Sequence, residues 1–106
     1  MPNVTINTNT DIQNFCVINT NSSIDHDCKI GNFTSIAPGV TLGGNVNIGS
    51  NTFIGIGSTV IHKINIGDNV LIGSSSNVVN NIDSNKTYYG NPAKFIKDRK
   101  IDDKFL

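Results

Sequence analysis

The sequence predicts an all-β domain, a parallel β-helix built from six-residue repeats, and three observations lead to this prediction. First, branched aliphatic residues recur at every sixth position from Ile6 to Val78, 13 times in succession and with no insertion. Second, a small or β-branched residue lies four positions after each of them, and Asn or Gly often lies three positions after. Third, Gly directly follows six of the aliphatic residues. An α-helix would need an apolar spacing near 3.6 and a simple strand a spacing of 2, whereas a spacing of six fits short strands separated by regular turns.

Each hexad is expected to supply one short side of a triangular coil. Three hexads make a coil of 18 residues, so 13 hexads make a little over four coils. The coils stack like parallel strands about 4.8 Å apart, and the aliphatic side chains of each coil cover those of the next. Asn and Gly tolerate the left-handed backbone conformation that tight corners require.

The hexad register predicts a β-helix over residues 1–83 and a C-terminal extension over residues 84–106. In the extension we expect an edge strand at Tyr88 and Tyr89, a turn at Gly90 to Pro92 and then a short amphipathic helix or a tail. A chain of 106 residues is long enough for one domain and not for two.

Composition argues against several classes of partner. The formal net charge is zero, so there is no electrostatic case for nucleic acid or an anionic membrane. No apolar run approaches the roughly 20 residues of a membrane span. The polar N-terminus lacks the basic and apolar regions of a signal peptide, and a cytoplasmic protein is therefore expected.

His26 is the candidate for chemistry. It lies between Asp25 and Asp27 at a position that should face outward, and flanking carboxylates can orient an imidazole and stabilise its conjugate acid, as a general base requires. The alternative is an exposed histidine between surface acids, which the spacing alone favours. Residues 18 apart stack in neighbouring coils, so one column contains His26, Gly44, His62 and Asn80.

A metal site and a reactive thiol are not expected. His26 and His62 are 36 residues apart, as are two zinc-ligand histidines of the gamma-class carbonic anhydrases, but the position of the third ligand is Gly67 here and the chain has no other His. Cys16 and Cys28 occupy the small inward position and are interpreted as inert core residues. Phe15 and Phe33, 18 residues apart, are expected to stack outside the coil at a subunit interface.

Two stretches resemble the family of sialic-acid O-acetyltransferases and UDP-amino-sugar N-acetyltransferases. They are INTNSSIDHDCKIGNFTSIAPGVTLGGNVNIGSNTFIGIGSTV and the ending NIGDNVLIGSSSNVVNNIDSNKTYYGNPAK. The resemblance covers about residues 16–96, and its specific parts are the core DHDCKIG and the ending GNPAK together. The repeated Ile-Gly pair alone would identify only the fold.

The resemblance implies a left-handed coil, a homotrimer with active sites between neighbouring subunits, and transfer from acetyl-CoA to a hydroxyl or amine of a sugar or sugar nucleotide, in bacterial-type sugar modification. It implies His26 as the general base and Asp27 as the residue that orients it. A main-chain N–H near Gly44 would hold the thioester oxygen. Positions implied to contact acetyl-CoA or its acetyl group are Ser35, Ile56, Ser74 and Lys94, the last as a point charge toward a phosphate.

Two departures from the family leave alternatives open. Some relatives have His at the position of Ser35, where serine can still donate a hydrogen bond. Many relatives also carry a Rossmann-like domain before the β-helix that helps to bind the sugar nucleotide, whereas this sequence begins at the β-helix. The small-molecule acceptor therefore stays open. The other hypotheses are a non-catalytic trimeric scaffold and an acetyltransferase for serine or another small acceptor.

Overall fold

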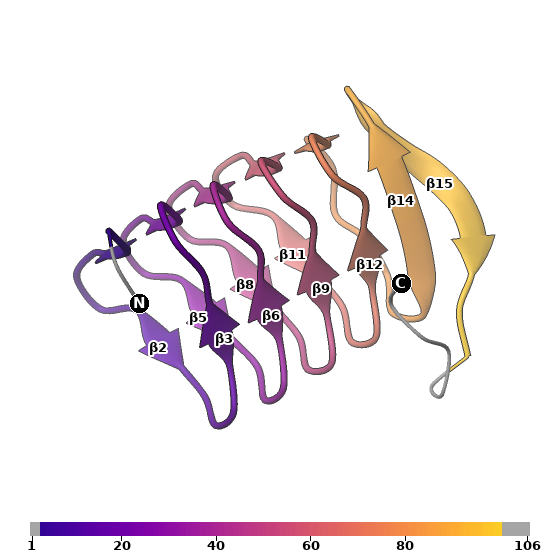
Figure 1. Cartoon of the computed structure of the whole chain (residues 1–106). Coiled ribbons are helices and arrows are strands. Elements are labelled where there is room, and N and C mark those ends of the chain that lie inside the picture. The colour runs from indigo at the N-terminus through magenta and orange to yellow at the C-terminus, as the bar shows by residue number, and fades with distance from the viewer. Residues whose placement is uncertain (1–2, 101–106) are drawn as a thin grey trace.

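A computed structural model describes residues 3–100 as a parallel β-solenoid, and no helix occurs within them. Figure 1 shows the coils stacked side by side along one axis, with a long hairpin at the C-terminal end. Thirteen strands of two residues each form the sides of the coils. Their bounds are β1 Thr5–Ile6, β2 Asp11–Ile12, β3 Val17–Ile18, β4 Ser23–Ile24, β5 Lys29–Ile30, β6 Ser35–Ile36, β7 Thr41–Leu42, β8 Asn47–Ile48, β9 Phe53–Ile54, β10 Thr59–Val60, β11 Asn65–Ile66, β12 Leu71–Ile72 and β13 Asn77–Val78.

The strands form three sheets, one on each side of the triangle. Sheet A has the order β1-β4-β7-β10-β13, sheet B the order β11-β8-β5-β2, and sheet C the order β15-β14-β12-β9-β6-β3. Within the regular coils, paired residues are 18 apart, as in Ser23↔Thr41 and Thr41↔Thr59 of sheet A. The register confirms the 18-residue coil that the hexad spacing predicts. Three corners connect the sheets, and we name them AB, BC and CA.

The core follows the two inward positions of each hexad. The aliphatic residues of the central coils are almost fully buried, as at Ile24, Ile54 and Val60. The small position four residues later is also buried, and its hydroxyl groups donate hydrogen bonds to main-chain carbonyls of the next coil. Thr34 donates to Gly49 O at 2.7 Å, Thr52 to Gly67 O at 2.9 Å and Ser58 to Gly73 O at 2.9 Å. These bonds satisfy polar groups that would otherwise destabilise the interior.

Cysteines take the same inward position. Cys28 is buried and Cys16 half-buried, and both are free thiols. The Cys28 thiol donates to Gly43 O at 3.2 Å. Burial raises the pKa of the Cys28 thiol above its ordinary value, which keeps it protonated and inert.

The corners depend on one residue with a left-handed backbone, three positions after the aliphatic residue. Asn or Gly occupies this position in many coils, as at Asn45 (φ 59°) and Gly57 (φ 70°). Residues less suited to it also occur there, among them Phe15, Phe33 and Lys63, each with φ of 60°. The close stacking of coils, in which each main chain bonds to the next, holds these residues in place.

The coil changes at its C-terminal end. Ile82 forms a bridge with Ile66, and β14 (Lys86–Gly90) pairs with β12 through Leu71↔Thr87, so the last coil is two residues shorter than the others. The hexad spacing places Ile82 in the small position after Val78, and the structure corrects this, because Ile82 instead takes the aliphatic position above Ile66.

After the short coil the chain forms a hairpin. β14 pairs antiparallel with β15 (Ala93–Asp98) around a turn with a cis Asn91-Pro92 bond. The edge strand expected at Tyr88 and Tyr89 is present as part of β14, but the helix or tail expected from Ala93 is wrong, because Ala93–Asp98 pair with β14 as a strand. Residues 101–106 lie outside the described part. Within the described part, no helix is long and apolar enough to cross a membrane.

Candidate functional site

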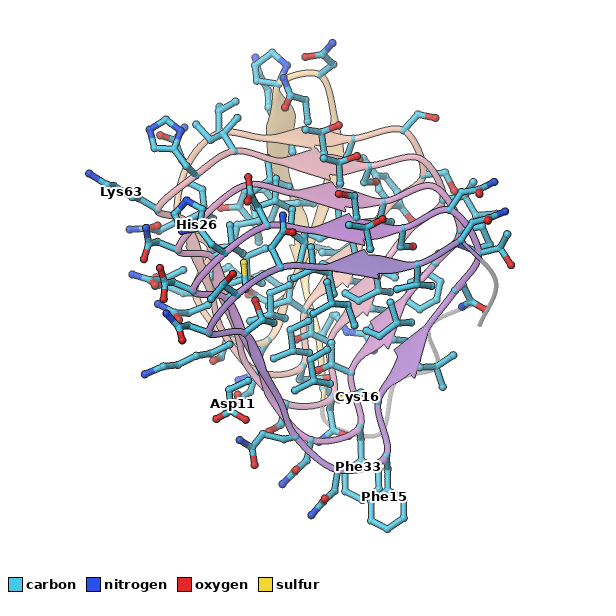
Figure 2. All side chains as sticks on the ribbon, turned by 90° about the vertical axis from the view of Figure 1, so that its left-hand side faces the viewer. Asp11, Phe15, Cys16, His26, Phe33 and Lys63 are labelled. Carbon is cyan, nitrogen blue, oxygen red and sulfur yellow. The ribbon has the colours of Figure 1, made fainter. Side chains whose placement is uncertain are left out.

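His26 lies on the AB corner, in the turn between β4 and β5. Figure 2, a view along the coil, places it at a different corner from the Phe15–Phe33 pair. The turn forms because Asp27 accepts a left-handed backbone (φ 57°), which short polar side chains tolerate better than most others do. Main-chain bonds anchor both flanks of the turn, with the Asp27 N–H donating to Thr8 O at 2.9 Å and the Asn45 N–H donating to His26 O at 2.9 Å.

The imidazole of His26 is paired with Asp27. The distance from His26 Nδ1 to Asp27 Oδ2 is 3.0 Å, and the two side chains are 54% and 46% exposed. An ionised carboxylate can only accept, so Nδ1 carries the proton in the neutral ring. The lone pair of Nε2 is then free to accept a proton from a bound molecule. This pairing is the arrangement that orients a histidine as a base.

The second flanking carboxylate, that of Asp25, bonds to the main chain of His26 and not to its ring. Asp25 Oδ1 accepts the main-chain N–H of His26 at 2.8 Å and the side-chain amide of Asn7 at 3.2 Å. The hydrogen bond from His26 N–H and the one from Asn7 lower the pKa of the Asp25 carboxyl below its ordinary value of 3.8. The sequence suggests that both carboxylates flank the imidazole, whereas in the structure only Asp27 hydrogen-bonds to the ring.

Gly44 lies directly beside the imidazole, one coil further along. A Cβ built on Gly44 would be 2.7 Å from His26 Nε2 and 2.8 Å from its Cε1. The carbonyl of Gly44 accepts the N–H of Lys63 at 2.9 Å. Among the residues that the structure describes, none accepts the N–H of Gly44. A glycine with an unused N–H therefore lies next to the free nitrogen of His26.

His62 is exposed two coils along the same corner. Within residues 3–100, no group of three or more His, Cys, Asp or Glu side chains is placed to hold a metal ion.

The other predicted site residues lie elsewhere on the chain. Ser35 is half-buried on β6 of sheet C, between Val17 and Phe53. Ile56 and Ser74 are exposed on the CA corner, and Lys94 is exposed on β15. One chain therefore brings together His26, Asp27 and Gly44 and keeps the other four predicted residues apart from them.

An aromatic pair projects from the BC corner. The rings of Phe15 and Phe33 are stacked with centroids 5.1 Å apart and an interplanar angle of 7°, and they are 76% and 54% exposed. The predicted stacking is confirmed.

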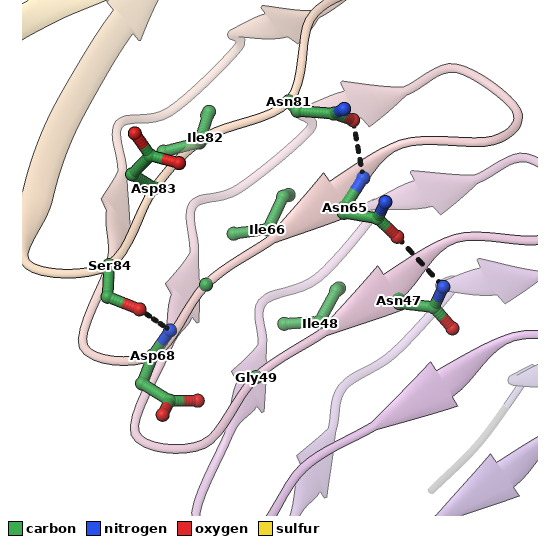
Figure 3. Close-up of a pocket in the computed structure, with 11 residues that line it drawn as sticks. Asn47, Ile48, Gly49, Asn65, Ile66, Asp68, Asn81, Ile82, Asp83 and Ser84 are labelled. Carbon is green, nitrogen blue, oxygen red and sulfur yellow. Dashed lines mark hydrogen bonds between the residues drawn. The ribbon is translucent and has the colours of Figure 1, made fainter.

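A groove of about 560 Å³ runs along sheet B toward the BC corner. Figure 3 shows Asn47, Asn65 and Asn81 along one edge of it. Asn47 Nδ2 donates to Asn65 Oδ1 at 2.8 Å, and the Asn65 N–H donates to Asn81 Oδ1 at 2.8 Å. The groove contains none of the residues that the sequence predicts for the site.

Sequence reasoning missed the part that Asp25 and Asn7 play at this corner. The signal was present, because the two residues are 18 apart and the 18-residue coil places them in adjacent coils. The sequence does not reveal which atom of His26 each carboxylate contacts, since that depends on the turn geometry.

Comparison with known proteins identifies the repeat. Residues 9–44 match the bacterial transferase hexapeptide (six repeats). Comparison with curated protein sequences finds no match. Among solved structures, the chain is similar to GDP-perosamine N-acetyl transferase from Caulobacter crescentus in complex with CoA and GDP-perosamine, with 30% identity and a TM-score of 0.86 over 91% of this chain and 46% of that one.

Two further solved structures are similar. The acetyltransferase domain of PglB from Neisseria gonorrhoeae, in complex with acetyl coenzyme A, is 28% identical with a TM-score of 0.78, over 89% of this chain and 55% of that one. Serine acetyltransferase from the same organism is 28% identical with a TM-score of 0.81, over 86% of this chain and 39% of that one. The chain spans about half the length of the first of these relatives. The resemblance to hexapeptide-repeat acetyltransferases is confirmed.

Proposed function

We propose that this protein transfers an acetyl group from acetyl-CoA to a hydroxyl or amine of a sugar or sugar nucleotide, with His26 as the general base. One observation carries the proposal: the ring of His26 is held by Asp27 through Nδ1, while its Nε2 lies beside Gly44, whose N–H is unused within the described residues. The similar structures named for N-acetyl transfer and for complexes with CoA or acetyl coenzyme A support it.

The chemistry follows from the three residues. His26 Nε2 takes a proton from the acceptor hydroxyl or neutral amine as its oxygen or nitrogen attacks the thioester carbon. The negative charge that develops on the carbonyl oxygen is stabilised by the Gly44 N–H. The carbon–sulfur bond then breaks, the acetyl group stays on the acceptor, and the thiolate of CoA leaves with the proton from the imidazolium. Asp27 stabilises the imidazolium between these steps.

The assembly is part of the same proposal. Ser35, Ile56, Ser74 and Lys94 lie on other sides of the coil from His26, so a neighbouring subunit in a homotrimer would have to present them to the His26 corner. Acetyl-CoA would then lie in the cleft between subunits, with Lys94 toward a phosphate. The left-handed sense of the coil and the cytoplasmic location, where acetyl-CoA is available, also belong to the proposal.

A second candidate is acetylation of serine, because a serine acetyltransferase is among the similar structures at 28% identity. It uses the same base and the same co-substrate and differs only in the acceptor. A third hypothesis, a scaffold without activity, predicts no binding of CoA.

The test is the release of CoA thiol from acetyl-CoA in the presence of a panel of acceptors: amino-sugar nucleotides, sialic acids, maltose and serine. General-base catalysis contributes about 10²–10⁴-fold, so we expect His26→Ala to lose at least about 100-fold in kcat. His62→Ala, in the same corner column, is the matched control and should keep the rate. Equal rates in wild type and His26→Ala would exclude His26 as the base.

Thermal shift with CoA separates the enzyme from the scaffold. At 10 times its Kd, a ligand stabilises the folded state by about 1.4 kcal/mol. No shift over a wide range of CoA concentrations would favour the scaffold.

A further inference from the structure

The main-chain N–H of His26 donates to a side chain of its own coil. On the BC corner, by contrast, three N–H groups at the same hexad position donate to side chains of the following coil. Asn14 N–H donates to Asn32 Oδ1 at 2.9 Å, and Ser50 N–H donates to Asp68 Oδ1 at 2.8 Å. At His26 the acceptor instead comes from the preceding residue, Asp25.

Gly44 explains the difference. It is the residue 18 positions after His26, so it occupies the place from which Asn32 and Asp68 reach back at the BC corner. Gly44 has no side chain, and none would fit while the imidazole keeps its present position, because a Cβ there would be 2.7 Å from His26 Nε2. The glycine that makes room for the imidazole therefore offers no side-chain acceptor to the His26 N–H, and the carboxylate of Asp25 accepts it instead.

We propose that Asp25 is a positioning residue for His26, which holds the main chain of the histidine while Asp27 holds its ring. The proposal rests on the proposed function for its consequence in catalysis. Asp25 itself accepts hydrogen bonds at both its carboxylate and its main-chain carbonyl. Asn7 Nδ2 donates to its carboxylate at 3.2 Å, and Thr10 Oγ1 donates to its carbonyl at 3.0 Å, both from the preceding coil.

The consequence is that three coils define the place of His26. The Asn7 coil holds Asp25, Asp25 holds the His26 N–H, and the following coil supplies both Gly44 and the Asn45 N–H that donates to His26 O. The ring bond to Asp27 alone would not locate Nε2, because without the Asp25 contact the main chain of His26 could shift relative to Asp27 within this exposed turn and weaken the ring bond. A displacement of about 1 Å at a catalytic group can cost about 100-fold in rate.

The test compares Asp25→Asn with Asp25→Glu. Asparagine keeps an oxygen at the same place but loses the charge, whereas glutamate keeps the charge but moves the oxygen by one methylene. If position matters, kcat of Asp25→Asn stays within about 3-fold of wild type and kcat of Asp25→Glu falls by about 10-fold or more, with the KM for acetyl-CoA within about 2-fold in both. The reverse order, or equal rates, would overturn the proposal.

Asp11→Glu is the matched control. Asp11 is an exposed aspartate on β2 whose carboxylate accepts a local bond from Gln13 at 3.0 Å, so the same substitution is made at a side chain that has no hydrogen bond to His26 or Asp25. Its kcat should equal that of wild type.

A readout without turnover separates this inference from the proposed function. The chain has only two histidines, so the imidazole nitrogens of His26 can be observed by NMR and assigned with a His62→Gln variant. In wild type and Asp25→Asn, neutral His26 should carry its proton on Nδ1, whereas in Asp25→Glu it should show a mixture of tautomers. The same tautomer in wild type and both variants would overturn the positioning role, even if kcat differs.

The two proposals fail in different ways. If no acceptor is acetylated but the tautomer pattern is found, the proposed function is wrong and the positioning role stands. If acetylation depends on His26 but Asp25→Glu behaves as wild type in rate and tautomer, the function stands and the positioning role is wrong.

Discussion

The imidazole of His26 lies against the Cα of Gly44 in the next coil, so closely that a Cβ on Gly44 would be 2.7 Å from Nε2. The imidazole of His26 and the main chain of Gly44 are therefore brought together by the stacking of two coils rather than by a pocket.

Gly44→Ala should impair activity more than folding. The added methyl group meets the far end of a side chain that is 54% exposed, so the ring can move aside at little cost in stability. The moved ring no longer presents Nε2, and we expect kcat to fall by about 10²-fold.

The measurement is kcat beside the urea midpoint of unfolding. Gly39→Ala is the contrasting control, because Gly39 has a φ of 72° and a Cβ at that position would make only ordinary van der Waals contacts. It should lose about 1 kcal/mol of stability and keep its activity. Full activity in Gly44→Ala would contradict the contact.

Asp27→Asn should keep the fold and lower the rate. Asparagine tolerates the left-handed backbone of position 27 (φ 57°) at least as well as aspartate does, so the free energy of unfolding should change by less than about 0.5 kcal/mol. The amide has no charge to stabilise the imidazolium, so kcat should fall by about 10-fold or more. Steady-state kinetics and denaturant unfolding measure the two quantities. A stable variant with wild-type kcat would remove Asp27 from the mechanism.

Thr52→Val should destabilise the coil without touching the site. The Thr52 hydroxyl donates to Gly67 O at 2.9 Å and accepts the Val70 N–H at 3.2 Å, and it is fully buried. Valine has nearly the same shape but satisfies neither group, so we expect a loss of about 1–3 kcal/mol.

Thr59→Val is the same substitution on the exposed side of β10, and it should stay within about 0.5 kcal/mol of wild type. Chemical denaturation measures both variants. Equal stabilities would mean that the buried hydroxyl ladder contributes nothing.

Asp25 should make the stability of the fold depend on pH in the acid range. The hydrogen bond from the His26 N–H and that from Asn7 lower the pKa of its carboxyl in the folded state. The folded state therefore binds fewer protons than the unfolded state, and the stabilisation is present above the ordinary value of 3.8 and is lost as the pH falls through the folded pKa.

Asp25→Asn removes this dependence because an amide does not titrate. As the pH is lowered from about 6 to below 3.8, the unfolding temperature of wild type should therefore fall relative to that of Asp25→Asn. A difference that stays constant over this range would contradict the shift.

Much of the fold follows from sequence because the repeat is so regular. With 13 aliphatic residues at a spacing of six, a stacked coil buries those from Ile18 onward in one core, and the spacing then places Gly44 beside His26 and Phe33 beside Phe15. The prediction is wrong at Ile82, which the spacing of six assigns to the small inward position but which takes the aliphatic position above Ile66. The last coil is two residues shorter than the others, and only the pairing of Ile82 with Ile66 reveals it.

The sequence by itself determined the coil, its length of 18 residues and the stacking of Gly44 on His26. Residues one coil apart must stack whatever their chemistry. The tertiary structure alone decided that Asp27 takes the ring of His26 and Asp25 its main-chain N–H. The reason is physical: both carboxylates are adjacent to the histidine in sequence, and the left-handed backbone of Asp27, together with the tie from Asn7 to Asp25, sets which atom each one reaches.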